Sequence, residues 1–126
     1  MSETIGYARV STARQNLDAQ TDALKQVGCT RIFTDKDRGV QSSRPGWDEL
    51  LAYIRHGDVL VVTELSRMTR SLLHLLDIVQ MLETRQVELK SLRENIDTST
   101  ATGRGFLSIM GVIAQMEREI KARAHA

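Results

Sequence analysis

Short apolar runs, separated by glycine and polar residues, dominate the hydrophobic pattern and predict strands. Such runs occupy residues 5–10, 31–34, 58–63 and 87–92, and residues 95–97 could add a short edge strand. The run at 58–63 is apolar almost without interruption, which is typical of a strand covered on both faces. The pattern therefore predicts a sheet of four to five strands.

Between these runs the apolar positions recur with helical spacing. We expect helices over residues 15–27, 45–57 and 72–82, with Gly28 and Gly57 as the stops of the first two. Strands that alternate with helices favour an α/β fold with a mostly parallel sheet and helices on both of its faces.

A last helix is predicted from about residue 102 to residue 126, and it is apolar around most of its circumference. A surface helix needs only one apolar stripe, so nearly all of this helix has to be covered. From residue 103 to residue 122 it would be about 30 Å long, and a small domain covers only one side of such a helix. We expect a second subunit on the other side; the alternative is a central core helix. The apolar positions are Phe106, Leu107, Ile109, Met110, Val112, Ile113 and Met116.

The composition fits one globular domain of 126 residues, 41% hydrophobic and 26% charged, without a repeat or a linker. The net charge of +1 provides no global basic field, so any argument for nucleic-acid binding rests on local arginines. The single cysteine, Cys29, cannot form an internal disulfide, which fits a reducing cytoplasm. The N-terminal residues lack a signal-peptide pattern, and we expect no membrane span.

The end of the first predicted strand is a candidate for chemistry. Alternate side chains of a strand share a face, so Tyr7, Arg9 and Ser11 point one way, while the small and apolar residues between them can face a core. This arrangement places a guanidinium beside a hydroxyl at the carboxyl end of the strand, where open α/β sheets bind ligands. The alternative is a surface arginine next to a serine that caps the following helix.

Three more arginines are expected at the same edge. Arg67 and Arg70 follow the third predicted strand and are three residues apart, so on a helical turn they share a face. Arg44 lies in the polar stretch 35–44, which is predicted to be a loop over this edge. Guanidinium groups can grip phosphate oxygens in pairs and stabilise the charge of a pentacovalent transition state. Together with Ser11 the pattern indicates attack on a phosphodiester, although each arginine alone would be ordinary on a surface.

Other chemistries have little support in the pattern. His56, His74 and His125 are scattered without the spacing of metal ligands, so we expect no metal. The chain has no phosphate-binding glycine loop and no dinucleotide fingerprint, so we expect no cofactor. We interpret Cys29 as a small core residue. No histidine is placed to activate Ser11, which argues against a Ser-His-Asp hydrolase.

Several motifs occur in one order along nearly the whole chain. They are residues 7–12 (Tyr-Ala-Arg-Val-Ser-Thr), 15–20, 32–36, 43–46, 57–62, 65–71 (Leu-Ser-Arg-Met-Thr-Arg-Ser), 96–99, 103–104 and 116–119. With these motifs in this order, the sequence resembles the catalytic domain of the serine recombinases, the resolvase and DNA invertase family. The resemblance implies a resolvase-like α/β fold with a long C-terminal dimerisation helix.

The resemblance also implies a mechanism and its residues. Ser11 would attack a DNA phosphodiester to form a 5′-phosphoserine link, without metal or ATP. The phosphate and transition-state ligands would be Arg9, Arg44, Arg67 and Arg70, with Tyr7 and Gln20 as supporting polar groups. The protein would bind double-stranded DNA as a homodimer and form a tetramer in synapsis. The dimer contact would involve Phe106, Leu107, Ile109, Met110, Ile113 and Met116, and candidates for DNA contact are Arg118, Lys121 and Arg123.

The sequence departs from the family pattern in two places. Many relatives have aspartate before the first arginine of the Leu-Asp-Arg-x-x-Arg motif, whereas this chain has Ser66, so that Glu64 or Asp35 would have to replace it as an acid if one is needed. The match fades after Glu119, and no helix-turn-helix DNA-binding domain follows. We therefore expect residues 1–126 to be a truncated catalytic domain, in which residues 102–126 begin the dimerisation helix.

Two other interpretations stay open at this point. One is a catalytically degenerate α/β oligomerisation or regulatory module, which Ser66 favours and the intact arginine set disfavours. The other is a small-molecule phosphotransfer enzyme, which the apolar last helix and the missing nucleotide loop disfavour. For a recombinase encoded by a bacterium or a mobile element, we expect a cytoplasmic location.

Overall fold

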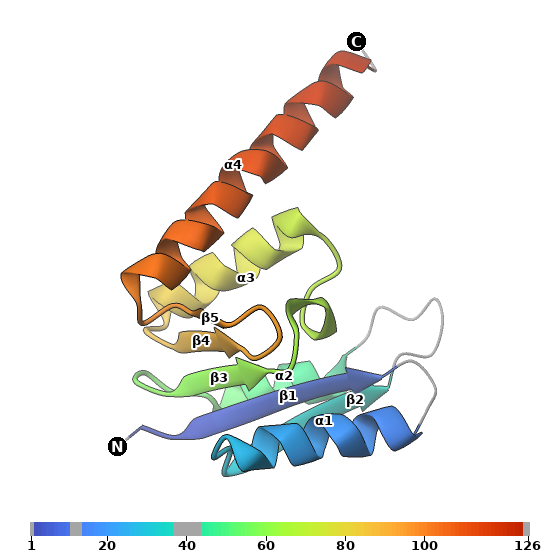
Figure 1. The fold of residues 1–126 in the computed structure, drawn as a ribbon, viewed down its shortest axis with the longest axis vertical. Coiled ribbons are helices and arrows are strands. Elements are labelled where there is room, and N and C mark those ends of the chain that lie inside the picture. The colour runs from blue at the N-terminus through green and yellow to red at the C-terminus, as the bar shows by residue number, and fades with distance from the viewer. Residues whose placement is uncertain (1, 11–13, 37–43, 125–126) are drawn as a thin grey trace.

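The computed structural model describes residues 2–10, 14–36 and 44–124, which form a five-stranded sheet and four α-helices. The strands lie in the order β2-β1-β3-β4-β5, and neighbours are parallel except for β4 and β5 (Figure 1). The predicted α/β fold with a mostly parallel sheet is therefore confirmed. The elements are β1 (Thr4–Val10), α1 (Arg14–Gln26), β2 (Arg31–Lys36), α2 (Pro45–Tyr53), β3 (Val59–Val62), the short 3-10 helix η1 (Leu65–Arg67), α3 (Leu72–Thr84), β4 (Glu88–Ser91), β5 (Ile96–Asp97) and α4 (Ala101–Ala124).

β1 lies between β2 and β3 and is covered on both faces. Ile5, Tyr7 and Ala8 expose no surface, so the expectation that the Tyr7 face of this strand lies away from the core is wrong for Tyr7. A strand inside a sheet with helices on both sides has no outward face along most of its length. β3 pairs with β1 as far as Val62, which lies opposite Tyr7, and β1 continues beyond that level to Val10.

Helices cover both faces of the sheet, as predicted. On one face, Leu24 of α1 packs with Ala8 and Val61, and Cys29 is partly buried against this smaller core. Burial raises the pKa of the Cys29 thiol to about 11. On the other face, α2 and α3 enclose the larger core, to which Trp47 and Leu75 belong. Figure 1 shows α1 and α2 on opposite sides of β1 and β2.

The predicted helix over residues 45–57 is shorter than expected. α2 ends at Tyr53, and Ile54 continues in an extended conformation with φ −67° and ψ 142°. Ile54 is nevertheless buried in the larger core, as its apolar character requires. The apolar spacing therefore identified a buried residue correctly, but placed it in a helix that had already ended.

α4 is longer than the surface on which it packs. Gly103, Leu107 and Ala114 are buried on the side that contacts β5 and α3, and the C-terminal half projects beyond the rest of the fold (Figure 1). The alternative of a central core helix is therefore wrong. Among the helices of the described residues, none combines the length and the apolar character that a membrane crossing requires. The large apolar side chains that α4 exposes are Phe106, Ile109, Val112, Ile113, Met116 and Ile120.

One residue that was expected to face a second subunit packs within this chain instead, and a second one does so in part. Leu107 is only 4% exposed and belongs to the larger core, so its assignment to a subunit contact is corrected. Met110 is partly buried against the same core. Residues three apart on a helix share a face, and this stripe is the one that turns toward α3. The apolar pattern alone does not say which stripe the rest of the fold covers.

Candidate active site

The side chains of Arg9 and Arg67 interlock at the carboxyl edge of β1 and β3. Arg9 Nη2 donates to the main-chain oxygen of Ser66 (3.0 Å), and Arg67 Nη1 donates to the main-chain oxygen of Arg9 (3.4 Å). Each arginine thus binds the main chain of the segment that carries the other. The structure brings these two predicted residues together because β1 and β3 are parallel neighbours and end at the same edge.

Gln20 of α1 fixes the main chain of Arg9. Its Oε1 accepts from the Arg9 N–H (3.2 Å), and its Nε2 donates to the Arg9 main-chain oxygen (3.1 Å). At this level β3 has ended, so the side-chain amide replaces a strand as the partner of these main-chain groups. Gln20 is only 7% exposed, and it therefore supports the site through Arg9.

Arg44, immediately before α2, reaches the same turn. Its Nη1 donates to the main-chain oxygen of Met68 (2.7 Å), and its guanidinium lies 5.1 Å from the ring centre of Trp47. The main-chain oxygens of Ser66 and Met68 thus accept from Arg9 and Arg44, one on each side of Arg67. The turn at residues 65–68 is the point at which three of the predicted arginines meet.

Arg70 lies just beyond this turn and is exposed. Because η1 ends at Arg67, the predicted helical face shared by Arg67 and Arg70 does not form. Arg70 instead joins Arg44 in lining an open hollow of about 380 Å³, together with Ser71 and His74. The fourth predicted arginine therefore lies beside Arg44, outside the helical turn that its spacing from Arg67 indicated.

Tyr7 is a buried residue that supports the site from within the core. Its hydroxyl donates to Asp35 Oδ2 (2.7 Å), and its ring meets the Trp47 ring edge-on, with 5.1 Å between the centres. Burial, and then the hydrogen bond to Asp35, raise the pKa of Tyr7 above its ordinary value of 10. The phenol therefore stays protonated and acts as a donor to Asp35, through which it can support the site.

Asp35 anchors the start of α2, a role that the sequence analysis missed. Its Oδ1 accepts from the Gly46 N–H (2.7 Å), and its Oδ2 accepts from the Trp47 N–H (2.9 Å) as well as from Tyr7. These amides belong to the first turn of a helix, where no main-chain acceptor is available. With three donors bound inside the fold, the carboxylate is a structural anchor and a poor substitute for the missing acid. The available signal was an aspartate at a strand end shortly before Pro45.

Comparison with known proteins assigns the chain to a family. A family profile described as "Resolvase, N terminal domain" matches residues 4–125. The chain belongs to the resolvase family. It is 47% identical over 116 residues both to the DNA-invertase of Enterobacteria phage P7 and to the serine recombinase gin of Escherichia phage Mu, covering 92% of this chain and 62% and 60% of those proteins. The Transposon Tn917 resolvase of Enterococcus faecalis is 41% identical over 115 residues, covering 91% of this chain and 62% of the resolvase.

Two solved structures share the fold of this chain. The N-terminal catalytic domain of TP901-1 integrase matches with a TM-score of 0.78 and 28% identity, covering 94% of this chain and 98% of that domain. A resolvase family site-specific recombinase from Streptococcus pneumoniae has the same fold, with a TM-score of 0.78 at 21% identity, over 99% of this chain and 94% of the other. The present resolvase-family chain spans about three fifths of the length of its curated relatives, 62% for the phage P7 protein.

In this member of the resolvase family, Glu64 supplies the carboxylate that pairs with Arg67. Glu64 Oε1 lies 3.0 Å from Arg67 Nε, an ion pair without the alignment of a hydrogen bond, and Glu64 Oε2 accepts from Arg93 Nη1 (2.7 Å). Ser66, where the family resemblance leads to an expectation of aspartate, is exposed and meets Arg9 through its main-chain oxygen. Glu64 therefore orients Arg67 and is itself held by Arg93.

Two of the basic residues near the end of α4 border the start of α3. Arg118, Lys121 and Arg123, the candidates for DNA contact, are all exposed. Arg118 and Lys121 line a hollow of about 180 Å³ that also includes Ser71. Ser71 borders the hollow of Arg44 and Arg70 as well, so both hollows adjoin the first residues of α3.

Ser11, the predicted nucleophile, lies outside the described residues. In the sequence it follows Val10, the last residue of β1. In the part of the chain that the structure describes, no group of three or more His, Cys, Asp or Glu side chains is arranged to hold a metal ion.

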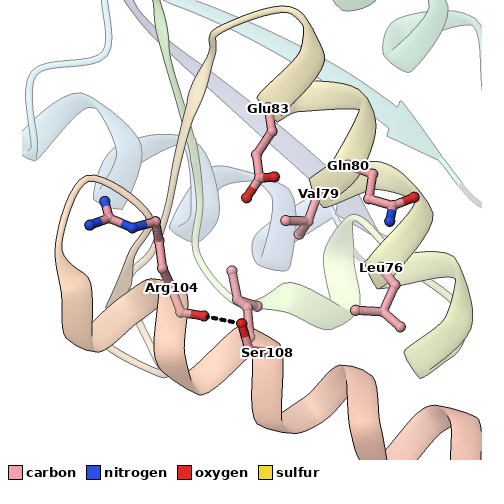
Figure 2. A pocket seen from close by; sticks show the side chains of 7 residues that line it. Leu76, Val79, Gln80, Glu83, Arg104 and Ser108 are labelled. Atoms are coloured by element: carbon pink, nitrogen blue, oxygen red, sulfur yellow. Dashed lines mark hydrogen bonds between the residues drawn. The ribbon is translucent and has the colours of Figure 1, made fainter.

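A separate hollow of about 400 Å³ lies between α3 and α4 (Figure 2). Gln80 and Glu83 line it from α3, and Arg104 and Ser108 line it from α4. Ser108 Oγ donates to the main-chain oxygen of Arg104 (3.0 Å), which satisfies this hydroxyl within its own helix. Since this hollow shares no lining residue with the arginine cluster, we do not assign it to the candidate site.

Proposed function

We propose that this chain carries out the strand-transfer chemistry of a serine site-specific DNA recombinase of the resolvase or invertase type. The observation that carries the proposal is the meeting of Arg9, Arg44 and Arg67 at one turn, with Ser11 next in sequence after β1. The names of its relatives, DNA-invertase, serine recombinase and resolvase, support double-stranded DNA as the substrate. Their phage and transposon origin favours a bacterial cytoplasmic protein.

In the proposed reaction, the Ser11 hydroxyl oxygen attacks a DNA phosphorus atom. The Oγ–P bond forms and the P–O3′ bond breaks, while Ser11 gives up its proton and the 3′ oxygen leaves as a hydroxyl group. The 5′ end remains attached as a phosphoserine ester, which conserves the energy of the broken bond. After strand exchange, a 3′-hydroxyl attacks this ester and releases Ser11, so the atom balance requires neither ATP nor water.

The arginines stabilise the charge that gathers on the five-coordinate phosphorus. Arg9, Arg44 and Arg67 are already fixed by main-chain oxygens or by Glu64, so little reorganisation is needed when the charge develops. Arg70 supplies the fourth guanidinium from the exposed side. Gln20 acts through the main chain of Arg9, and Tyr7 acts through its hydrogen bond to Asp35.

Replacement of Ser11 by alanine tests the assignment of the nucleophile. The chain is fused to a sequence-specific DNA-binding domain and mixed with supercoiled plasmid that carries paired sites for that domain. We expect a detergent-stable protein–DNA adduct with the wild-type chain and none with Ser11→Ala, because no other group on the enzyme forms the ester. Arg67→Ala should lower adduct formation by roughly 100-fold or more, as for the loss of a preorganised donor to a transition-state oxyanion. A matched control is Arg31→Ala, at the opposite end of the parallel sheet.

Other outcomes would favour the competing functions. An adduct that survives Ser11→Ala would contradict the assignment of Ser11. No adduct from the wild-type fusion would favour a degenerate oligomerisation or regulatory module, for which the exposed Ser66 is the structural argument. Phosphate transfer to or from a small ester, without any DNA adduct, would favour a small-molecule phosphotransfer enzyme.

We also propose that a second copy of the chain covers the exposed apolar face of α4, and that two such dimers form the tetramer of synapsis. The face contains Phe106, Ile109, Ile113 and Met116 from the predicted dimer contact. Four large apolar side chains on one projecting helix are costly to leave in water, which favours association. Beyond this face, Arg118, Lys121 and Arg123 would contact DNA phosphates.

Charged substitutions on this face should separate the subunits. In the double variant Ile109→Glu and Met116→Glu, two side chains that are 63% and 55% exposed in the single chain become carboxylates. We expect self-association to weaken by at least roughly 100-fold, because the apolar contacts are lost and charges would be buried. Sedimentation velocity over a range of concentrations measures this. Val27→Glu, which changes an exposed valine directly after α1, is the control. Unchanged sedimentation of the double variant, or a wild-type monomer at every concentration, would contradict the proposed contact.

A further inference from the structure

His74 has a place beside the arginine cluster that its position in the sequence did not indicate. It lies in the first turn of α3 and lines the open hollow of about 380 Å³ with Arg44, Arg70 and Ser71. From the sequence, this histidine was a candidate only for a metal ligand or for a base that activates Ser11, and neither role had support. In the structure it is the one uncharged titratable group among the residues that line this hollow.

The imidazole ring of His74 holds the main chain of Arg70. The main-chain N–H of Arg70 donates to His74 Nδ1 (3.2 Å). The main-chain N–H of His74 in turn donates to the Oγ of Ser71 (3.1 Å), the residue that caps α3. The Arg70 amide comes just before the first turn of α3, and the ring nitrogen supplies an acceptor for it. Only an unprotonated Nδ1 can accept this hydrogen bond, so the proton of the neutral ring is on Nε2.

The surrounding charges favour the neutral ring. Burial, followed by the guanidinium groups of Arg44 and Arg70, lowers the pKa of His74 below its ordinary value of 6.5. Arg9, at the end of β1, acts in the same direction, and Asp77 of α3 opposes it. A ring that is neutral at pH 7 keeps Nδ1 available to Arg70.

We propose that His74 is a positioning residue of the phosphate site, whose neutral Nδ1 fixes the main chain of Arg70 so that the Arg70 guanidinium is held at the hollow beside Arg44. This inference rests on the proposed function, in which both arginines bind a DNA phosphate. The hydrogen bond to Nδ1 also makes the binding of phosphate by Arg70 dependent on pH. As the pH falls through the pKa of His74, Nδ1 takes a proton, the bond from the Arg70 N–H is lost, and the segment before α3 is released.

Side-chain replacement at position 74 separates this role from a general structural one. In the fusion protein at pH 7.5, we expect His74→Ala to form the Ser11 adduct about fivefold to tenfold more slowly, as for the loss of one hydrogen bond. Asparagine can place its Oδ1 where Nδ1 lies, so His74→Asn should restore most of the rate. His56→Asn, at an exposed histidine between α2 and β3, is the matched control.

The pH profile gives the decisive comparison. The wild-type rate should fall below about pH 6.5 relative to that of His74→Asn, which has no proton to gain at this position. The same relative fall should persist in His56→Asn. Matching profiles for the wild type and His74→Asn would overturn the proposal. So would a wild-type rate that rises as the pH falls, because that result would indicate that protonated His74 binds phosphate directly.

An independent readout covers the case in which the proposed function fails. If the wild-type fusion forms no adduct at any pH, the Arg70 amide can be followed by NMR hydrogen exchange in the chain without DNA. We expect protection of this amide at pH 7.5 in the wild type and in His74→Asn, and its loss in His74→Ala. Equal exchange in all three proteins would overturn the positioning role, whatever reaction the site performs.

Discussion

Replacement of Gly103 by alanine is expected to destabilise the protein by about 3 kcal/mol, the upper part of the range for forced overpacking. A Cβ on Gly103 would lie 2.0 Å from the main-chain oxygen of Asp97 and 2.7 Å from its carbonyl carbon. These are main-chain atoms of β5, and they cannot turn aside as a flexible side chain can. Either α4 or β5 therefore has to move. Because α4 carries the exposed apolar face, the same movement should also weaken the proposed subunit contact.

Gly105 provides a matched control on the same helix. A Cβ at Gly105 would meet no atom within 4 Å, and the residue is exposed. Gly105→Ala should therefore stabilise the protein by about 0.5–1 kcal/mol, because alanine loses less backbone freedom than glycine when a helix forms. Urea unfolding followed by circular dichroism measures both variants. Two glycines that lie two residues apart in the same helix turn should thus give effects of opposite sign. A Gly103→Ala protein as stable as wild type would show that β5 yields easily and does not fix the start of α4.

The elements of the fold could be predicted because their local patterns agree with their tertiary environment. The apolar run at 58–63 is buried as β3 between two neighbouring strands, and the helix-period segments that flank it became α2 and α3. It was harder to predict which of two equally apolar residues would be buried. Leu107 and Ile109 are both large and aliphatic, yet one lies in the core and the other is exposed, because the position of α3 decides which stripe of α4 is covered. That position is a property of the whole chain.

The candidate site shows the same division. The meeting of Arg9 and Arg67 could be predicted, since parallel neighbouring strands end at one edge. The acceptors that hold the arginines could not, because they are main-chain oxygens at residues 66 and 68, and any sequence offers those groups. The pairing of His74 with Arg70 could not be predicted from the sequence either. Its role depends on where α3 begins, and a histidine four residues after an arginine carries no such signal by itself.

Replacement of Asp35 by alanine is expected to cost about 3–5 kcal/mol, the largest stability effect that we predict. The side chain is 6% exposed and accepts hydrogen bonds from Tyr7, Gly46 and Trp47. Its removal leaves a buried hydroxyl and two amides of the first turn of α2 without their acceptor. Each unsatisfied buried donor costs roughly 1–3 kcal/mol, partly offset if water enters the space. Thermal and urea unfolding should both report the loss.

Asp35→Asn separates the charge and acceptor geometry from the shape of the side chain. An amide offers one acceptor oxygen, so in either orientation its NH₂ group must face at least one donor that the carboxylate now satisfies. We therefore expect a loss of about 2 kcal/mol even for this isosteric change. Asp48 is an exposed residue in the first turn of the same helix, and Asp48→Asn should cost less than about 1 kcal/mol, since only its interaction with the helix dipole changes.

The site should respond together with the stability. Arg44 directly precedes α2, so a loosened first turn also loosens the residue that reaches Met68 and the Arg70 hollow. At a temperature at which the Asp35→Asn fusion is still folded, we expect its rate of adduct formation to be about tenfold lower than that of the wild type. The rate of the Asp48→Asn fusion should be unchanged. If Asp35→Asn were as stable and as active as wild type, the carboxylate would not be what holds α2. Arg44 would then be positioned by Trp47 and the 65–68 turn without help from β2.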